Sequence, residues 1–125
     1  MILHYFIKKE NKENKIAENI YKTILKISNQ IINEYNYFKD KNYNSSFEVV
    51  SIFLIIYIKT NINKNITNYK IINESLISIF ISDLDESLRT KGIGDMSIGK
   101  YVKSYVKKFY FRLSRFPEIK EEFEN

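Results

Sequence analysis

The sequence predicts an all-α fold, a single compact helical domain of about four main helices. Three glycines and one proline among 125 residues are too few for the turns of a β-sandwich or a β-barrel. Apolar residues instead recur every three or four positions, which is the spacing of one face of an α-helix. A chain of this length with 44% hydrophobic residues fits one domain, residues 1–125.

The first helix is predicted over residues 13–38, and residues 1–12 are expected to be a frayed N-terminus. Residues 39–45 are rich in Asp, Asn and Ser and predict a linker, after which Ser45 or Ser46 is expected to cap the next helix. The apolar stripe of the first helix consists of Ile16, Ile20, Ile24, Ile27, Ile31, Tyr35 and Phe38.

The second helix, about residues 46–59, is apolar nearly all round and is therefore expected at the centre of the domain. Its Val and Ile content would also suit a strand, but an isolated strand has no partner here. Phe53 tests this position. If Phe53 is fully buried, Phe53→Ala costs roughly 3–5 kcal/mol of unfolding free energy, whereas a loss under about 1 kcal/mol would show that it faces outward.

The third and fourth helices follow an Asn-rich connection at residues 61–68. The third helix ends at Gly92, and the fourth, about residues 96–116, takes Ser97 or Asp95 as its cap and stops at Pro117, before an acidic tail at 117–125. The apolar positions of the third helix are Tyr69, Ile72, Leu76, Ile79, Phe80, Leu84 and Leu88. Those of the fourth are Ile98, Val102, Tyr105, Val106, Phe109, Leu113 and Phe116.

The composition argues against an enzyme. There is no cysteine and His4 is the only histidine, so catalytic triads and thiolate or histidine metal sites lack their parts, and no cofactor is expected. The carboxylates between the third and fourth helices do not follow a calcium-loop spacing. Asp95 is expected to cap the fourth helix, so that Asp95→Asn is nearly silent while Asp95→Ala costs about 1 kcal/mol. Asp83 or Asp85 is expected to pair with Arg89 or Lys91.

The fourth helix carries the strongest charge pattern in the chain, within a net charge of +5. Basic side chains cover the half of this helix opposite its apolar arc, with aromatic residues among them, and this combination suits RNA or anionic lipid headgroups. A merely solvated face in a lysine-rich chain is an equally open interpretation. The predicted partner-binding residues are Lys100, Lys103, Lys107, Lys108, Tyr110, Phe111, Arg112 and Arg115, with Tyr101 at the edge.

The loop between these helices carries a resemblance. Residues 83–103 resemble the signature D-x-D-x-x-L-R-x-x-G-[VI]-G-D-[ML]-x-[VI]-x-K-x-[MV]-K of the ubiquinol-cytochrome c chaperone family. The likeness covers about residues 15–115 and is strongest at 83–112; it departs from the family at residues 110–112, where Tyr-Phe-Arg replaces Tyr-Gly-Arg. The motif residues are Asp83, Asp85, Arg89, Gly92, Gly94, Asp95 and Met96.

The resemblance implies an α-helical assembly factor of the alphaproteobacterial type. Such a protein binds newly synthesised cytochrome b and promotes assembly of respiratory complex III, in the cytoplasm and peripheral to the inner membrane. The ribosome or an anionic membrane surface would be a further partner, and no small-molecule substrate is implied. The rival hypothesis is a basic helical RNA- or ribosome-binding module without a membrane-protein client, which predicts strongly salt-dependent RNA binding.

Overall fold

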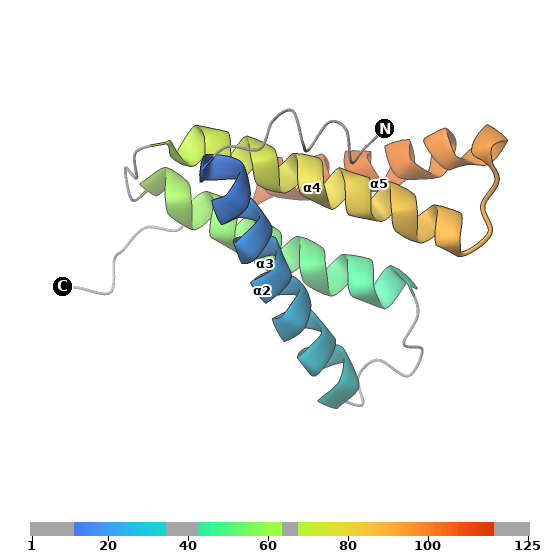
Figure 1. The fold of residues 1–125 in the computed structure, drawn as a ribbon, viewed down its shortest axis with the longest axis horizontal. Helices are drawn as coiled ribbons and strands as arrows, with labels where there is room; N and C mark the ends of the chain where they lie inside the picture. Colours follow the sequence, from blue (N-terminus) through green and yellow to red (C-terminus); the bar gives the residue numbers. More distant parts are fainter. Residues whose placement is uncertain (1–11, 35–42, 64–67, 117–125) are drawn as a thin grey trace.

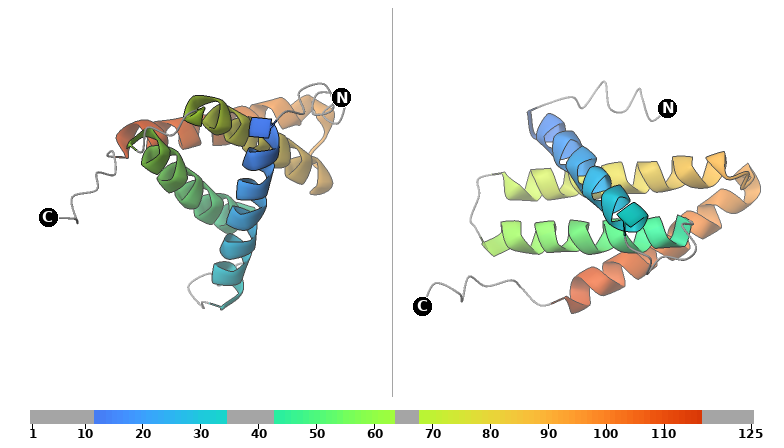
Figure 2. Two further views of the ribbon diagram at one scale, coloured as in Figure 1. Left: turned by 60° about the vertical axis from the view of Figure 1, so that its left-hand side comes forward. Right: turned by 90° about the horizontal axis from the view of Figure 1, so that it is seen from below.

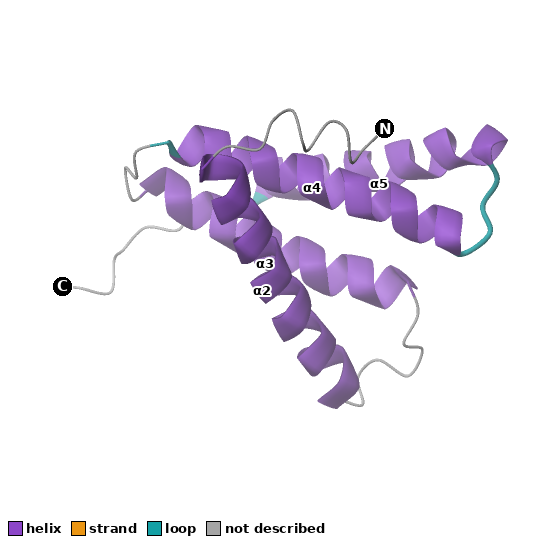
Figure 3. Cartoon of the chain, in the orientation of Figure 1, coloured by secondary structure: helices purple, strands orange, loops and turns teal. Residues whose placement is uncertain are grey.

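Four α-helices make up the regular structure of the part of the chain that the structure describes (Figure 1). The structure, a computed structural model, describes residues 12–34, 43–63 and 68–116. The helices are α2 (Lys12–Glu34), α3 (Tyr43–Asn63), α4 (Tyr69–Thr90) and α5 (Asp95–Arg115). Within these described ranges there is no strand (Figure 3), so the predicted all-α class is confirmed. None of the described helices is both long and apolar enough to cross a membrane.

The helices form three layers. α3 and α4 lie side by side in opposite directions, α2 crosses over this pair on one side, and α5 lies on the other side (Figure 2). Both α3 and α4 contact all the other helices. The predicted central helix therefore shares the centre of the domain with α4.

A cluster of aromatic rings joins all four helices. The ring of Phe80 on α4 has its centroid 6.5 Å from that of Tyr21 on α2, 5.9 Å from Phe47 on α3 and 5.1 Å from Phe109 on α5. Ring centroids within about 7 Å in offset or tilted arrangements attract each other beyond the burial of their area. All four side chains are buried, so this cluster is the middle of the core.

The buried face of α2 differs from the predicted stripe. Of the predicted isoleucines only Ile24 is buried, Ile27 is 39% exposed, and Tyr35 and Phe38 lie outside the described residues. The buried face is rotated by roughly 80° at 3.6 residues per turn. Its members are Asn14, Ala17, Tyr21, Ile24, Ser28 and Ile32. Small and mixed-polarity residues form this face because α2 packs closely on α3 and α4, where Tyr21 also finds a hydrogen-bond acceptor on α4.

The ends of α3 also correct the prediction. Ser45 and Ser46 lie inside the helix, which begins at Tyr43, and therefore do not cap it. At the other end, Asn61 belongs to the helix instead of a linker. It is 4% exposed, and its Nδ2 donates to Oδ1 of Asn73 on α4 at 3.3 Å, which explains how an asparagine is accommodated in this interior position.

One side of α3 is open to solvent despite its apolar sequence. Leu54 is fully buried, but Ile52 is 49% and Ile56 is 36% exposed. Phe53 is partly buried, so the cost expected for full burial does not apply to it. Only three described helices, α2, α4 and α5, contact α3, and they leave this strip of it uncovered.

The turn from α4 to α5 depends on Gly92, as predicted. Gly92 has φ +94°, a conformation that favours glycine, and its N–H donates to the carbonyl of Arg89 at 3.0 Å. The N–H of Ile93 donates to the carbonyl of Leu88 at 3.2 Å. These two bonds form a Schellman motif, which ends α4 and fixes the direction in which the chain leaves it.

Two phenylalanines on α5 provide a matched test of this packing. Phe109 is 1% exposed and Phe111 is 59% exposed. We expect Phe109→Ala to lower the unfolding free energy by about 3–5 kcal/mol because it leaves a cavity in the aromatic cluster. Phe111→Ala should cost far less because solvent already surrounds most of that ring. Chemical denaturation of both variants measures the difference, and equal losses would contradict the placement of α5.

Candidate interaction surface

The outward side of α5 is basic and aromatic along most of its length. The core-facing residues Ile98 and Phe109 are buried, whereas Tyr101, Tyr110 and Phe111 are 47%, 46% and 59% exposed. The exposed cations of the helix are Lys100, Lys103, Lys107, Lys108 and Arg115. The structure thus places these candidate residues on one solvent-facing side, opposite the apolar arc.

Arg112 is the exception among the candidate cations. Its Nη2 donates to Oε1 of Glu48 on α3 at 3.0 Å, and its Nη1 donates to the second carboxylate oxygen. This bidentate pair joins α3 to α5 and balances the charge of Arg112 within the fold. The tertiary structure therefore gives Arg112 a bracing role in addition to its place on the basic side.

Next to this pair, Tyr105 packs its ring 4.7 Å from that of Phe47. Burial raises the pKa of the Tyr105 hydroxyl, and the negative charges of Glu48 and ionised Tyr101 raise it further. Because its pKa is raised above the ordinary value, Tyr105 stays neutral over the physiological pH range.

A hollow of about 280 Å³ lies between α3 and α5 on the exposed side. The guanidinium carbon of Arg115 lies 5.0 Å from the centre of the Phe111 ring at its wall, within cation–π distance. The hollow is lined by Ile52, Ile55, Phe111, Arg112, Arg115 and Phe116. The contribution of α3 to this surface was not predicted from the sequence. The signal for it is that α3 is apolar on more sides than its three neighbouring helices cover.

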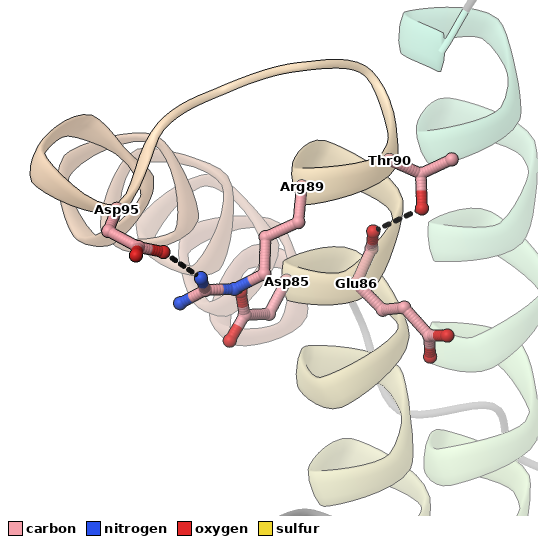
Figure 4. A network of polar contacts seen from close by, with 5 residues as sticks. All are labelled: Asp85, Glu86, Arg89, Thr90 and Asp95. Carbon is pink, nitrogen blue, oxygen red and sulfur yellow. Dashed lines mark hydrogen bonds and ion pairs between the residues drawn. The ribbon is translucent and has the colours of Figure 1, made fainter.

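The motif residues at the α4–α5 turn form an ion-pair network (Figure 4). Nε of Arg89 donates to Oδ1 of Asp85 at 2.7 Å, and Nη1 of Arg89 donates to Oδ1 of Asp95. The hydrogen bond to Asp85 and then that to Asp95 raise the pKa of Arg89 above its ordinary value. The predicted pairing of Asp85 with Arg89 is confirmed, and it extends across the turn to the first residue of α5.

The predicted capping role of Asp95 is wrong. The N-cap of α5 is Gly94, in an extended conformation with no side-chain cap hydrogen bond, and Ser97 lies within the first turn. The side chain of Asp95 is 89% exposed and points to Arg89, as Figure 4 shows. Because Gly94 occupies the N-cap position, Asp95 is the first residue of the helix and cannot cap it. From there its carboxylate pairs with Arg89 across the turn.

Asp83 takes part in a different contact from the other motif acids. Its Oδ2 accepts a hydrogen bond of 2.5 Å from the Tyr21 hydroxyl, so it ties α4 to α2. It borders a groove of about 620 Å³ among α2, α3 and α4, which has an apolar floor that includes Phe47 and Leu84 and which Glu86 also lines. In contrast, Met96, at the start of α5, is fully exposed.

The described part of the chain offers several surfaces for binding other molecules. Among the described residues no three His, Cys, Asp or Glu side chains come close enough together to hold a metal ion. A small helical protein that presents an exposed cationic and aromatic side, a groove and an apolar hollow has the features of a protein that acts by contact with other molecules.

A comparison with protein families identifies the family of this chain. A family model, ubiquinol-cytochrome C chaperone, matches residues 39–121, which include α3, α4 and α5 in full. The chain belongs to this family. Its role is accordingly that of a chaperone with a protein client, as the motif at residues 83–103 predicts. Searches of curated proteins and of solved structures gave no match.

The ion-pair role of Asp95 predicts a result opposite to that of a cap. Asp95→Asn and Asp95→Ala should lower the melting temperature equally, because Arg89 loses a negative partner in both variants, and the effect should shrink at high salt. In an Arg89→Gln background the Asp95 substitutions should have less effect. A wild-type melting temperature for Asp95→Asn beside a lower one for Asp95→Ala would restore the capping interpretation.

The Glu48–Arg112 pair should be measurable in a double-mutant cycle with Glu48→Gln and Arg112→Met. Because both side chains are about one-third exposed, with 38% and 34% of their surfaces accessible, we expect a coupling of about 0.2–1 kcal/mol in unfolding free energy. Arg115→Met is the matched control and should show no coupling to Glu48. If Glu48 coupled equally to Arg112 and to Arg115, the result would contradict a specific ion pair between Glu48 and Arg112.

Proposed function

We propose that this chaperone binds newly synthesised cytochrome b and promotes its assembly into respiratory complex III. The match of residues 39–121 to the family supports the proposal, because it spans the motif turn and the whole basic side of α5. We also propose that the protein is a single domain over residues 1–125, of the alphaproteobacterial type, that works in the cytoplasm next to the inner membrane. Residues 1–11 and the acidic segment 117–125 lie outside the described residues.

The charge of α5 supports a position beside nascent membrane proteins. A polytopic client is synthesised by a ribosome whose RNA is anionic, next to a membrane leaflet with anionic headgroups. Exposed lysines on a rigid helix are attracted to both surfaces over about a Debye length, near 8–10 Å. We therefore assign partner contact to the exposed cations and aromatic residues of α5.

Affinity capture tests the client. The tagged full-length protein is expressed in its host, captured after detergent extraction, and examined for cytochrome b. We expect cytochrome b to be enriched over other membrane proteins. Capture of ribosomal RNA with no enrichment of cytochrome b would instead support the RNA-binding module and would contradict the proposal.

A charge-reversal variant tests the basic side of α5. Lys100→Glu, Lys103→Glu and Lys107→Glu together should leave the fold nearly intact, because exposed charges usually change stability by less than about 0.5 kcal/mol each. Association with ribosomes or membranes should fall. If phosphates of RNA are the partner, each lost contact should flatten the dependence of log affinity on log salt concentration by about 0.7–0.9.

The matched control reverses three exposed lysines on α2, Lys12, Lys22 and Lys26. It changes the net charge by the same amount on a different face, so its association should stay near that of the wild type. If the α5 variant also associates like the wild type, the basic side is merely solvated and our assignment of the contact is wrong.

A further inference from the structure

Three large apolar side chains are exposed together where α3 and α5 meet. Ile52 and Ile56 on α3 are 49% and 36% exposed, and Phe111 on α5 is 59% exposed. Ile52 and Phe111 both line the 280 Å³ hollow, and Ile56 follows Ile52 by one helical turn. We call these three residues, together with Phe116 in the hollow, the α3–α5 patch.

Both helices that form the α3–α5 patch carry cations on the same side as the patch. Arg115 stacks on Phe111, and Lys108 lies on the same side of α5 two turns before Arg115. Lys59 lies on the same side of α3, seven residues after Ile52. The residues that line the hollow include no carboxylate, and Arg112 in its wall is already balanced by Glu48. The patch is thus apolar, and its unbalanced charged neighbours by contact and by helical spacing are the cations Arg115, Lys108 and Lys59.

The chemistry of the apolar residues distinguishes between anionic partners. RNA would stack its bases on Phe111, but Ile52 and Ile56 have no aromatic face and gain little from bases. A bilayer surface satisfies both parts of the patch, because phosphate headgroups accept the cations while the acyl boundary below them takes up apolar side chains. Long Lys and Arg side chains reach headgroups while their stems remain in apolar surroundings.

We propose that the α3–α5 patch docks this protein on an anionic lipid bilayer, with Phe111 and Ile52 inserted at the acyl boundary and Lys59, Lys108 and Arg115 on the headgroup phosphates. This inference rests on the proposed function in one respect, since it names the anionic partner of α5. The proposed contact surface includes α3 as well as α5. Arg112 is not one of the cations that bind the bilayer, because it pairs with Glu48 and joins the two helices.

Vesicle co-sedimentation of the purified full-length protein tests the docking. The wild type should sediment with vesicles of phosphatidylcholine mixed with phosphatidylglycerol and only weakly with phosphatidylcholine alone. Ile52→Ser and Phe111→Ser should each weaken binding about tenfold, because each removes an inserted apolar side chain. Ile71→Ser is the matched control, since Ile71 is 45% exposed on α4, and it should bind like the wild type.

Charge variants separate the two contributions to binding. Lys108→Glu and Arg115→Glu should each weaken binding at least about fivefold at low salt, and this defect should shrink as salt screens the headgroups. The Ile52→Ser and Phe111→Ser defects should persist at high salt because they do not depend on charge. Melting temperatures and circular dichroism of all variants confirm that they are folded.

Three results would overturn the lipid assignment. The first is that Ile52→Ser and Phe111→Ser bind vesicles as well as the wild type does, and the second is that the wild type binds both vesicle compositions equally. The third is that the patch variants lose cytochrome b capture in detergent while their vesicle binding is unchanged, which would make the patch a site for a client helix. Failure of the wild type to capture cytochrome b would contradict the proposed function and leave the vesicle result standing, so the two failures are distinguishable.

Discussion

The ring of Phe80 fixes the arrangement of the whole domain, because it contacts one aromatic ring from each of the other three helices. Aromatic rings are large and rigid, and their contacts prefer a few orientations, so a shared ring constrains both the distance and the rotation of its neighbours. With Phe109 directed into this cluster, the opposite side of α5 must face solvent. The exposure of the basic residues is thus a consequence of how the core is packed.

Ion pairs near both ends of α5 further restrict how this helix lies against α3 and α4. At its beginning, Arg89 holds Asp95 to the end of α4, and toward its other end Arg112 pairs with Glu48 on α3. Ion pairs at a surface contribute little stability individually, but here each joins two helices and limits their relative rotation. The motif acids at the α4–α5 turn therefore have a structural explanation that requires neither a metal ion nor catalysis.

The exposed surface combines contributions from two helices of opposite character. α5 is amphipathic and supplies the cations and Phe111, whereas the strongly apolar α3 supplies Ile52 and Ile56. A chaperone contacts its protein client reversibly, and a small apolar area beside exposed cations limits both the size and the charge of the molecules that it attracts. This arrangement agrees with the chaperone role of the family.

The sequence by itself determined the helical class, the end of α4 at Gly92, the amphipathic division of α5 and the family, because these depend on local periodicity, backbone freedom and fixed motif spacing. It did not determine which side of α2 is buried, since Ala17, Tyr21 and Ser28 carry no strong apolar signal and become interior only where α3 and α4 approach them. The exposure of Ile52 and the pairing of Arg112 with Glu48 were likewise decided by tertiary structure. Both depend on which helix lies beside α3 and on how far that neighbour covers it, and no spacing within a single helix contains that information.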